Sequence, residues 1–137
     1  MVGRPVVTRL ERDECLWLLS QSSFGRLAVS IGAIPAIRSI SFALAAEHVV
    51  FRVAPSSALC RAATSAVVAF QADHYDPEAL QTWSVSVTDH CNEVHDESLL
   101  SELRTLPLDP WAQEDAADRF FRISLNLVKG ERVEWAK

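Results

Sequence analysis

The chain has 137 residues, 49% of them hydrophobic, and its 18 acidic and 13 basic side chains give a net charge of −5. This length suits one core and is short for two ordinary domains, so we expect a single domain over residues 1–137. The acidic balance, with no two basic residues adjacent, argues against a surface that follows nucleic-acid phosphates. We therefore expect no nucleic-acid partner.

The first residues lack the apolar core of a signal peptide, and no stretch approaches the ~18 apolar residues of a membrane helix. We therefore expect a cytoplasmic protein that does not contact membranes. Three widely spaced cysteines, Cys15, Cys60 and Cys91, form neither an even disulfide set nor the close pairs of a zinc site. They are predicted to be reduced thiols, mostly buried.

Near the N-terminus, Thr8 and Glu11 have the spacing of a capping box, which predicts a helix whose apolar face carries Cys15, Leu18 and Leu19. Three extended runs follow, at residues 24–30, 34–44 and 48–54. The turns between them, around Gly32 and at residues 45–47, are predicted hairpins, although neither carries an Asn-Gly pair.

Pro55, Ser56 and Ser57 then open a predicted helix over residues 58–65. The first N–H groups of a helix are unpaired and attract anions. Three strands that lead into a serine-lined helix start therefore predict a cradle for a phosphorylated cofactor.

The second half of the chain is predicted to continue with strands over residues 66–73 and 83–94. In the second of these, Trp83, Val85 and Val87 alternate with Ser84 and other hydroxyl residues. A helix over 97–106 follows. A strand over 120–128, with alternate apolar residues through Leu127 on one face, and a short strand over 132–135 complete the chain. Six or seven strands joined mostly as hairpins, with helices at the margins, indicate a mainly β (α+β) fold, an antiparallel barrel.

The strings ECLWLL and FGRLAVS, then AFQAD and WSV, occur in this order along the chain. Together they resemble the pyridoxamine 5'-phosphate oxidase-related family of flavin- and deazaflavin-binding split β-barrels, and the likeness spans nearly the whole chain. The resemblance implies a homodimeric split β-barrel that binds FMN or a deazaflavin in two clefts between the subunits. It also implies an oxidoreductase-like protein, of unknown substrate, in which the cofactor carries hydride.

Carried over by position, the resemblance implies cofactor contacts at Ser39, Ser41, Arg52, Ser56, Ser57, Ala58, Leu59, Trp83 and Ser84. Arg52 would pair with a phosphate, and Ser56 and Ser57 would supply hydroxyl and backbone donors. Ser39 and Ser41 would contact the ring system as small polar side chains. Trp83 and Ser84 match a Trp-Ser pair at the interface cleft. No catalytic residue is assigned.

Two positions depart from the family pattern. Ala58 stands where the pattern has a lysine, and Val53 where it has a threonine. A lost charged hydrogen bond costs roughly 1.5–3 kcal/mol, or one to two decades in affinity. The alternative function is therefore a barrel without cofactor that binds a small molecule or another partner.

Ordinary structural roles remain open for the same residues. Arg52 could pair with Glu47 or Asp73 at the surface, Ser56 could be a helix N-cap, and Trp83 could pack in the core or an interface. Ser39 and Ser41 could simply face solvent. His90 and Cys91 would point to opposite faces of a strand, so we expect no metal site there.

Overall fold

The computed structural model describes residues 3–108 and 119–136. These residues form nine strands and three helices. In chain order, the strands are β1 (Pro5–Arg9), β2 (Phe24–Ile31), β3 (Ile34–Ser41), β4 (Ala43–Ala45), β5 (His48–Val53), β6 (Ala66–Asp76), β7 (Gln81–Glu93), β8 (Arg119–Ser124) and β9 (Val128–Trp135). The helices are α1 (Arg12–Ser20), α2 (Ala58–Ala63) and α3 (Glu97–Leu103).

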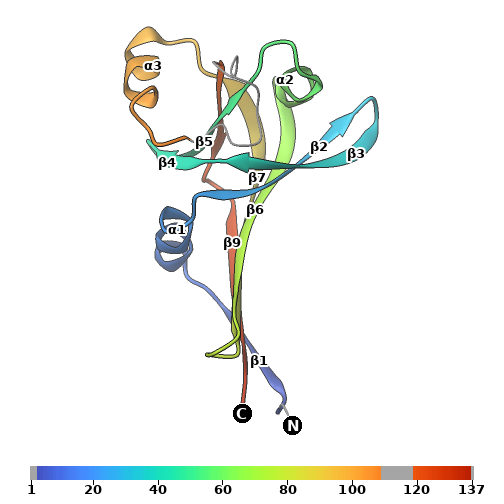
Figure 1. The fold of residues 1–137 in the computed structure, drawn as a ribbon, viewed down its shortest axis with the longest axis vertical. Coiled ribbons are helices and arrows are strands. Elements are labelled where there is room, and N and C mark those ends of the chain that lie inside the picture. Colours follow the sequence, from blue (N-terminus) through green and yellow to red (C-terminus); the bar gives the residue numbers. More distant parts are fainter. Residues whose placement is uncertain (1–2, 109–118, 137) are drawn as a thin grey trace.

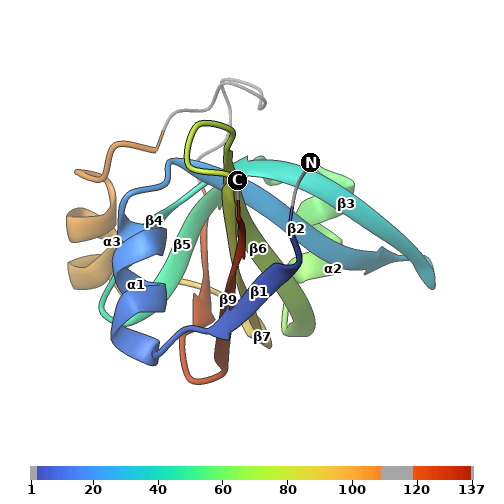
Figure 2. The same ribbon diagram turned by 90° about the horizontal axis from the view of Figure 1, so that it is seen from below.

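All strand pairs are antiparallel, in the order β3-β2-β6-β7-β8-β5-β4, and β9 joins β7 on one side and β1 on the other. The sheet curls into a half-barrel, with α1 and α3 at one side and α2 at the other (Figures 1 and 2). The long strands β6, β7 and β9 continue beyond the half-barrel with β1 as an extended arm (Figure 1). This arrangement confirms the predicted mainly β split barrel with peripheral helices.

The core fills the inside of the curled sheet, because alternate side chains of each strand point inward. On β6, Val68, Phe70 and Ala72 are buried, as their alternation predicts. Phe70 also meets Phe42 edge to face, with ring centroids 4.7 Å apart. A smaller apolar cluster packs beneath α3, and Val50 of β5 belongs to it. β5 is therefore buried on both faces.

The N-terminal segment differs from its prediction. Thr8 lies in β1, opposite Arg132, and the N-cap of α1 is Glu11, which makes no side-chain capping bond. The predicted capping box is therefore wrong, because pairing with β9 holds Thr8 in an extended strand. The apolar face of α1 is confirmed, since Cys15, Leu18 and Leu19 are buried.

Both predicted hairpin turns are confirmed. Gly32 and Ala33 have φ of 57° and 66°, and Ala46 and Glu47 have φ of 49° and 60°. Two successive residues with positive φ match the right-handed twist of the flanking strands. These turns reach that geometry without an Asn-Gly pair.

Several predicted boundaries move. The run over 34–44 is broken at Phe42, whose N–H donates to the carbonyl of Ser23, and so divides into β3 and β4. Leu127 precedes β9 and is 64% exposed, so its predicted place on the buried face was wrong.

The cysteines Cys15, Cys60 and Cys91 are free and buried, as predicted. Among the described helices, none combines the length and apolar character needed to cross a bilayer.

Candidate functional site

Three of the predicted contacts, Ser39, Ser41 and Ser84, lie on the side of the sheet that faces away from the core. We call this surface, formed by β3, β2, β6, β7, β9 and β1, the outer face. Strand pairing places one polar row across it: Ser39, Arg26, Gln71, Ser86 and Lys129. A second row runs beside it: Asp73, Ser84, Glu131 and Arg9. The outer face is therefore a polar platform built from six strands.

The charges on this platform differ in how they are partnered. The guanidinium of Arg26 forms an ion pair with the carboxylate of Asp73 at 2.5 Å across β2 and β6. Arg9 and Lys129 make no ion pair within the described part of the chain. Two cations on the outer face are therefore available to a ligand.

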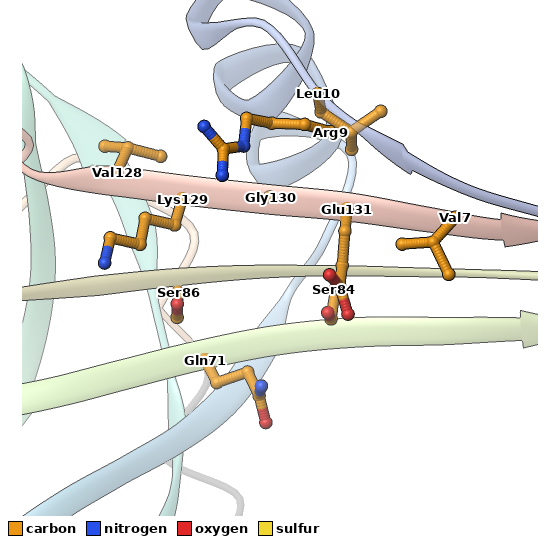
Figure 3. Close-up of a pocket in the computed structure, with 10 residues that line it drawn as sticks. All are labelled: Val7, Arg9, Leu10, Gln71, Ser84, Ser86, Val128, Lys129, Gly130 and Glu131. Carbon is orange, nitrogen blue, oxygen red and sulfur yellow. The ribbon is translucent and has the colours of Figure 1, made fainter.

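A cavity of about 800 Å³ opens on the outer face beside these two cations (Figure 3). Gln71, Ser84 and Ser86 form its polar floor on β6 and β7. The ends of β1 and β9 supply the remaining lining, including Val7 and Val128 as apolar contacts. This volume is within the usual range for small-molecule sites, ~300–1,000 Å³.

The predicted phosphate segment lies elsewhere, at the start of α2. Ser57 is the N-cap: its hydroxyl donates to the carbonyl of Ala54 at 2.7 Å and accepts from the N–H of Cys60 at 3.1 Å. The N-cap expected at Ser56 is therefore one residue later, and the Ser57 hydroxyl is occupied in holding the helix. Ser56 is exposed.

Ala58 and Arg61 line a smaller hollow of about 350 Å³ between α2 and the β2–β3 turn. Leu59 precedes the buried Cys60 and packs against the core. Arg61 is exposed, and its Nη1 donates to the carbonyl of Ser56 at 3.4 Å. Where the family pattern has a lysine at the helix start, this chain presents an arginine one turn later.

Neither of the last two predicted contacts belongs to the outer face, since Arg52 lies on β5 and Trp83 is directed toward the core. Arg52 lies over the ring of Phe120, 5.5 Å from its centroid, and its buried Nε has no hydrogen-bond partner among the described residues. Asp73, one of the two surface partners considered for Arg52, pairs with Arg26 instead. Trp83 shares the inward alternation of Val85 and packs against the core.

The structure places His90 and Cys91 on opposite faces of β7, one exposed and one fully buried. Within residues 3–108 and 119–136, no group of three His, Cys, Asp or Glu side chains is arranged to hold a metal ion. Loss of hydration on burial raises the pKa of the Cys91 thiol to about 12. Cys91 is thus an uncharged core residue.

Sequence reasoning missed Arg9, Gln71 and Lys129 as site residues. On β6, Gln71 lies between the buried residues Phe70 and Ala72, so its side chain points to the other face of the sheet. The alternation in the sequence could therefore have predicted a polar residue on the outer face at this position. Arg9 could be found only with knowledge that residues 5–9 pair with β9, because that segment carries no burial pattern of its own.

This chain is similar to known proteins in both sequence and structure. The sequence profile described as pyridoxamine 5'-phosphate oxidase matches residues 11–132. A protein of Mycobacterium tuberculosis, named only as uncharacterized, is 34% identical over 132 residues, which cover 93% of this chain and 86% of that protein. The structure of an FAD-binding protein from Mycobacterium smegmatis matches with a TM-score of 0.81 at 30% identity, covering 93% of this chain and 98% of that one.

A conserved protein of unknown function from Corynebacterium diphtheriae matches with a TM-score of 0.74 at 29% identity, over 91% of this chain and 96% of that one. The profile match covers most of the chain, and two structures of similar length share its curled sheet. This chain therefore belongs to the pyridoxamine 5'-phosphate oxidase family.

Proposed function

We propose that this protein binds a flavin and acts as a flavin-dependent oxidoreductase on a small organic substrate. The observation that carries the proposal is the outer face, where the predicted ring contacts Ser39 and Ser41 share one surface with the predicted cleft residue Ser84. The 30% identical relative is an FAD-binding protein, and this likeness supports FAD or FMN over a deazaflavin.

Residues of β5 and of the start of α2 offer suitable donors for the phosphate of such a cofactor. Arg52 has a buried Nε without a partner among the described residues, and both Ser56 and Arg61 are exposed. Guanidinium groups suit phosphate because they present paired donors in one plane. We propose that Arg52, Ser56 and Arg61 hold the phosphate, while Ser57 keeps the start of α2 in place.

A bound flavin would supply hydride transfer, which needs no acid–base pair from the protein. The contribution of this chain is to bind the ring, orient it and exclude water. Ser39 and Ser41 are small, so a planar ring can lie close to the strands and still find hydroxyl partners.

We further propose that the working form is a homodimer joined through the β2, β3 and β6 part of the outer face. Four large apolar side chains on this part are between 54% and 67% exposed: Phe24, Ile37, Val67 and Tyr75. Exposed apolar groups gathered on one surface are typical of protein interfaces. A second copy would cover them and enclose a cofactor between the two sheets.

The second candidate is a barrel without cofactor, which binds another small molecule. Two observations favour it: Ala58 offers a methyl group where the family pattern has a cation, and the hydroxyl of Ser57 is already satisfied within the chain. Fewer donors would then face a phosphate.

The experiment that separates these candidates identifies small molecules released from the purified protein. We expect a flavin absorbance spectrum and the mass of FAD or FMN, and saturable binding when stripped protein is titrated with either one. A deazaflavin titration runs in parallel. Colourless protein that binds none of the three at micromolar concentration would support the barrel without cofactor.

A further inference from the structure

We propose that the cavity on the outer face is a second ligand site, which binds the carboxylate of a planar organic anion through Arg9 and Lys129. The cavity is lined by β1, β6, β7 and β9 together with Leu10, whereas the proposed phosphate residues belong to β5 and α2. The proposal rests on the proposed function only in that such an anion would be the substrate. The binding itself does not require a flavin.

Strand register brings the two cations within reach of one ligand. Arg9 lies opposite Glu131, and Lys129 is two residues earlier on the same strand, β9. Such diagonal neighbours are ~7–8 Å apart, a separation that long side chains span. In Figure 3 the guanidinium of Arg9 extends along β9 toward the Lys129 end, while Glu131 is directed toward Ser84.

Arg9 and Lys129 differ from nearby arginines, which form ion pairs with carboxylates of the same chain. Arg26 is paired with Asp73, and Arg132 on β9 is paired with Glu14 of α1 at 2.7 Å. In the described part of the chain, Arg9 and Lys129 have no such carboxylate. With Glu131 as the one carboxylate of the lining, the cavity has one excess positive charge in a chain of net charge −5. That local balance suits a monoanion.

The remaining lining suits a flat molecule. Ser84 and Ser86 are small and half-buried, so a ring can approach the strands and accept or donate hydrogen bonds. Val7 and Val128 add apolar contact beside them. A carboxylate can receive two parallel bonds from a guanidinium, which fixes its orientation as well as its affinity. An aromatic or heteroaromatic carboxylate combines these features.

The test uses 1-naphthoate as the anionic probe and 1-naphthalenemethanol as its neutral counterpart, with calorimetry on the full chain. Losing a charged hydrogen bond should weaken naphthoate binding roughly tenfold in Arg9→Gln and in Lys129→Met. Glu131→Gln removes a repelling carboxylate and should strengthen binding about threefold. The neutral alcohol should bind all variants alike.

Arg104→Gln is the matched control, because Arg104 is an exposed arginine at the end of α3, outside the cavity. It should leave naphthoate binding unchanged. Circular dichroism checks that each variant is folded. Naphthoate that fails to bind, or that binds all five proteins equally, overturns the proposal.

Flavin titration separates this site from the proposed flavin site. Naphthoate that binds equally well with and without saturating flavin supports a second site, whereas competitive displacement by flavin overturns it. If no flavin binds but naphthoate shows the expected dependence on Arg9, Lys129 and Glu131, the proposed function fails and this inference stands.

Discussion

At the scale of single residues, Ala58 is the position where we expect a substitution to raise flavin affinity. It lines the hollow beside Arg61, where a longer side chain meets open space. We predict that Ala58→Lys strengthens FMN or FAD binding about tenfold, because it adds a charged donor at the proposed phosphate residues. Quenching of flavin fluorescence at low and high salt measures the effect, and the gain should shrink as salt screens the new charge.

Gln21→Lys serves as the control, since it adds the same charge at the exposed end of α1. It should not alter flavin affinity. An Ala58→Lys protein that is folded but shows no gain would argue that the phosphate does not bind at α2.

Cys91 gives a prediction about pH. Burial raises the pKa of its thiol from 9.0 to about 12, so the folded state holds the proton more tightly than the unfolded state. The resulting stability is present below about pH 9 and is lost as the pH rises from 9 toward 12. Between pH 8 and pH 10, the free energy of unfolding of the natural protein should fall about 1 kcal/mol more than that of Cys91→Ala. Urea titration at both pH values measures this difference, and parallel declines in the two proteins would contradict it.

At the scale of elements, the close approach of β2 to its neighbour β6 depends on Gly25. A Cβ built there would lie 2.6 Å from the carbonyl oxygen of Gln71 and 2.6 Å from the ring of Phe70. We predict that Gly25→Ala lowers the free energy of unfolding by about 2–3 kcal/mol, because backbone and a packed ring must both move. Chemical denaturation measures the change.

Gly32→Ala is the control for that substitution. Gly32 has φ of +57° but no neighbouring atom within 4 Å of a built Cβ, so only the backbone conformation is penalised. A cost of about 1 kcal/mol is expected. If both variants lose equal stability, the close approach at Gly25 is not the cause.

The elements also show what the sequence could and could not predict. Strands such as β6 and β7 were recovered because alternate burial leaves a period of two in their residues. β1 was missed because all five of its side chains are exposed, so only pairing with β9 defines it. The same limit hid Arg9, which reaches the cavity only through that pairing. Ser84, which also lines the cavity, was predicted only as a cofactor contact implied by the family resemblance.

At the scale of the whole molecule, we predict a dimer at micromolar concentration by light scattering. Ile37→Glu places a charge among the apolar side chains of the outer face and should shift the protein toward monomer. Ile34→Glu is the control, because Ile34 is similarly exposed, 69% against 67%, but has the opposite alternation on β3. A natural protein that stays monomeric would contradict both the dimer and the shared cleft.

The pairing of β1 with β9 brings the two chain ends together at the tip of the arm, where the N–H of Gly3 donates to the carbonyl of Ala136 at 3.1 Å (Figure 1). The first and last described residues are therefore direct neighbours in space. A short peptide could join the ends, and new ends could be opened at the exposed β2–β3 turn without breaking a strand pair. Every strand would keep its neighbours after such a circular permutation, although β1 and β9 would then be joined as a hairpin. The outer face thus depends on which strands pair with each other, and not on the order in which the strands follow one another along the chain.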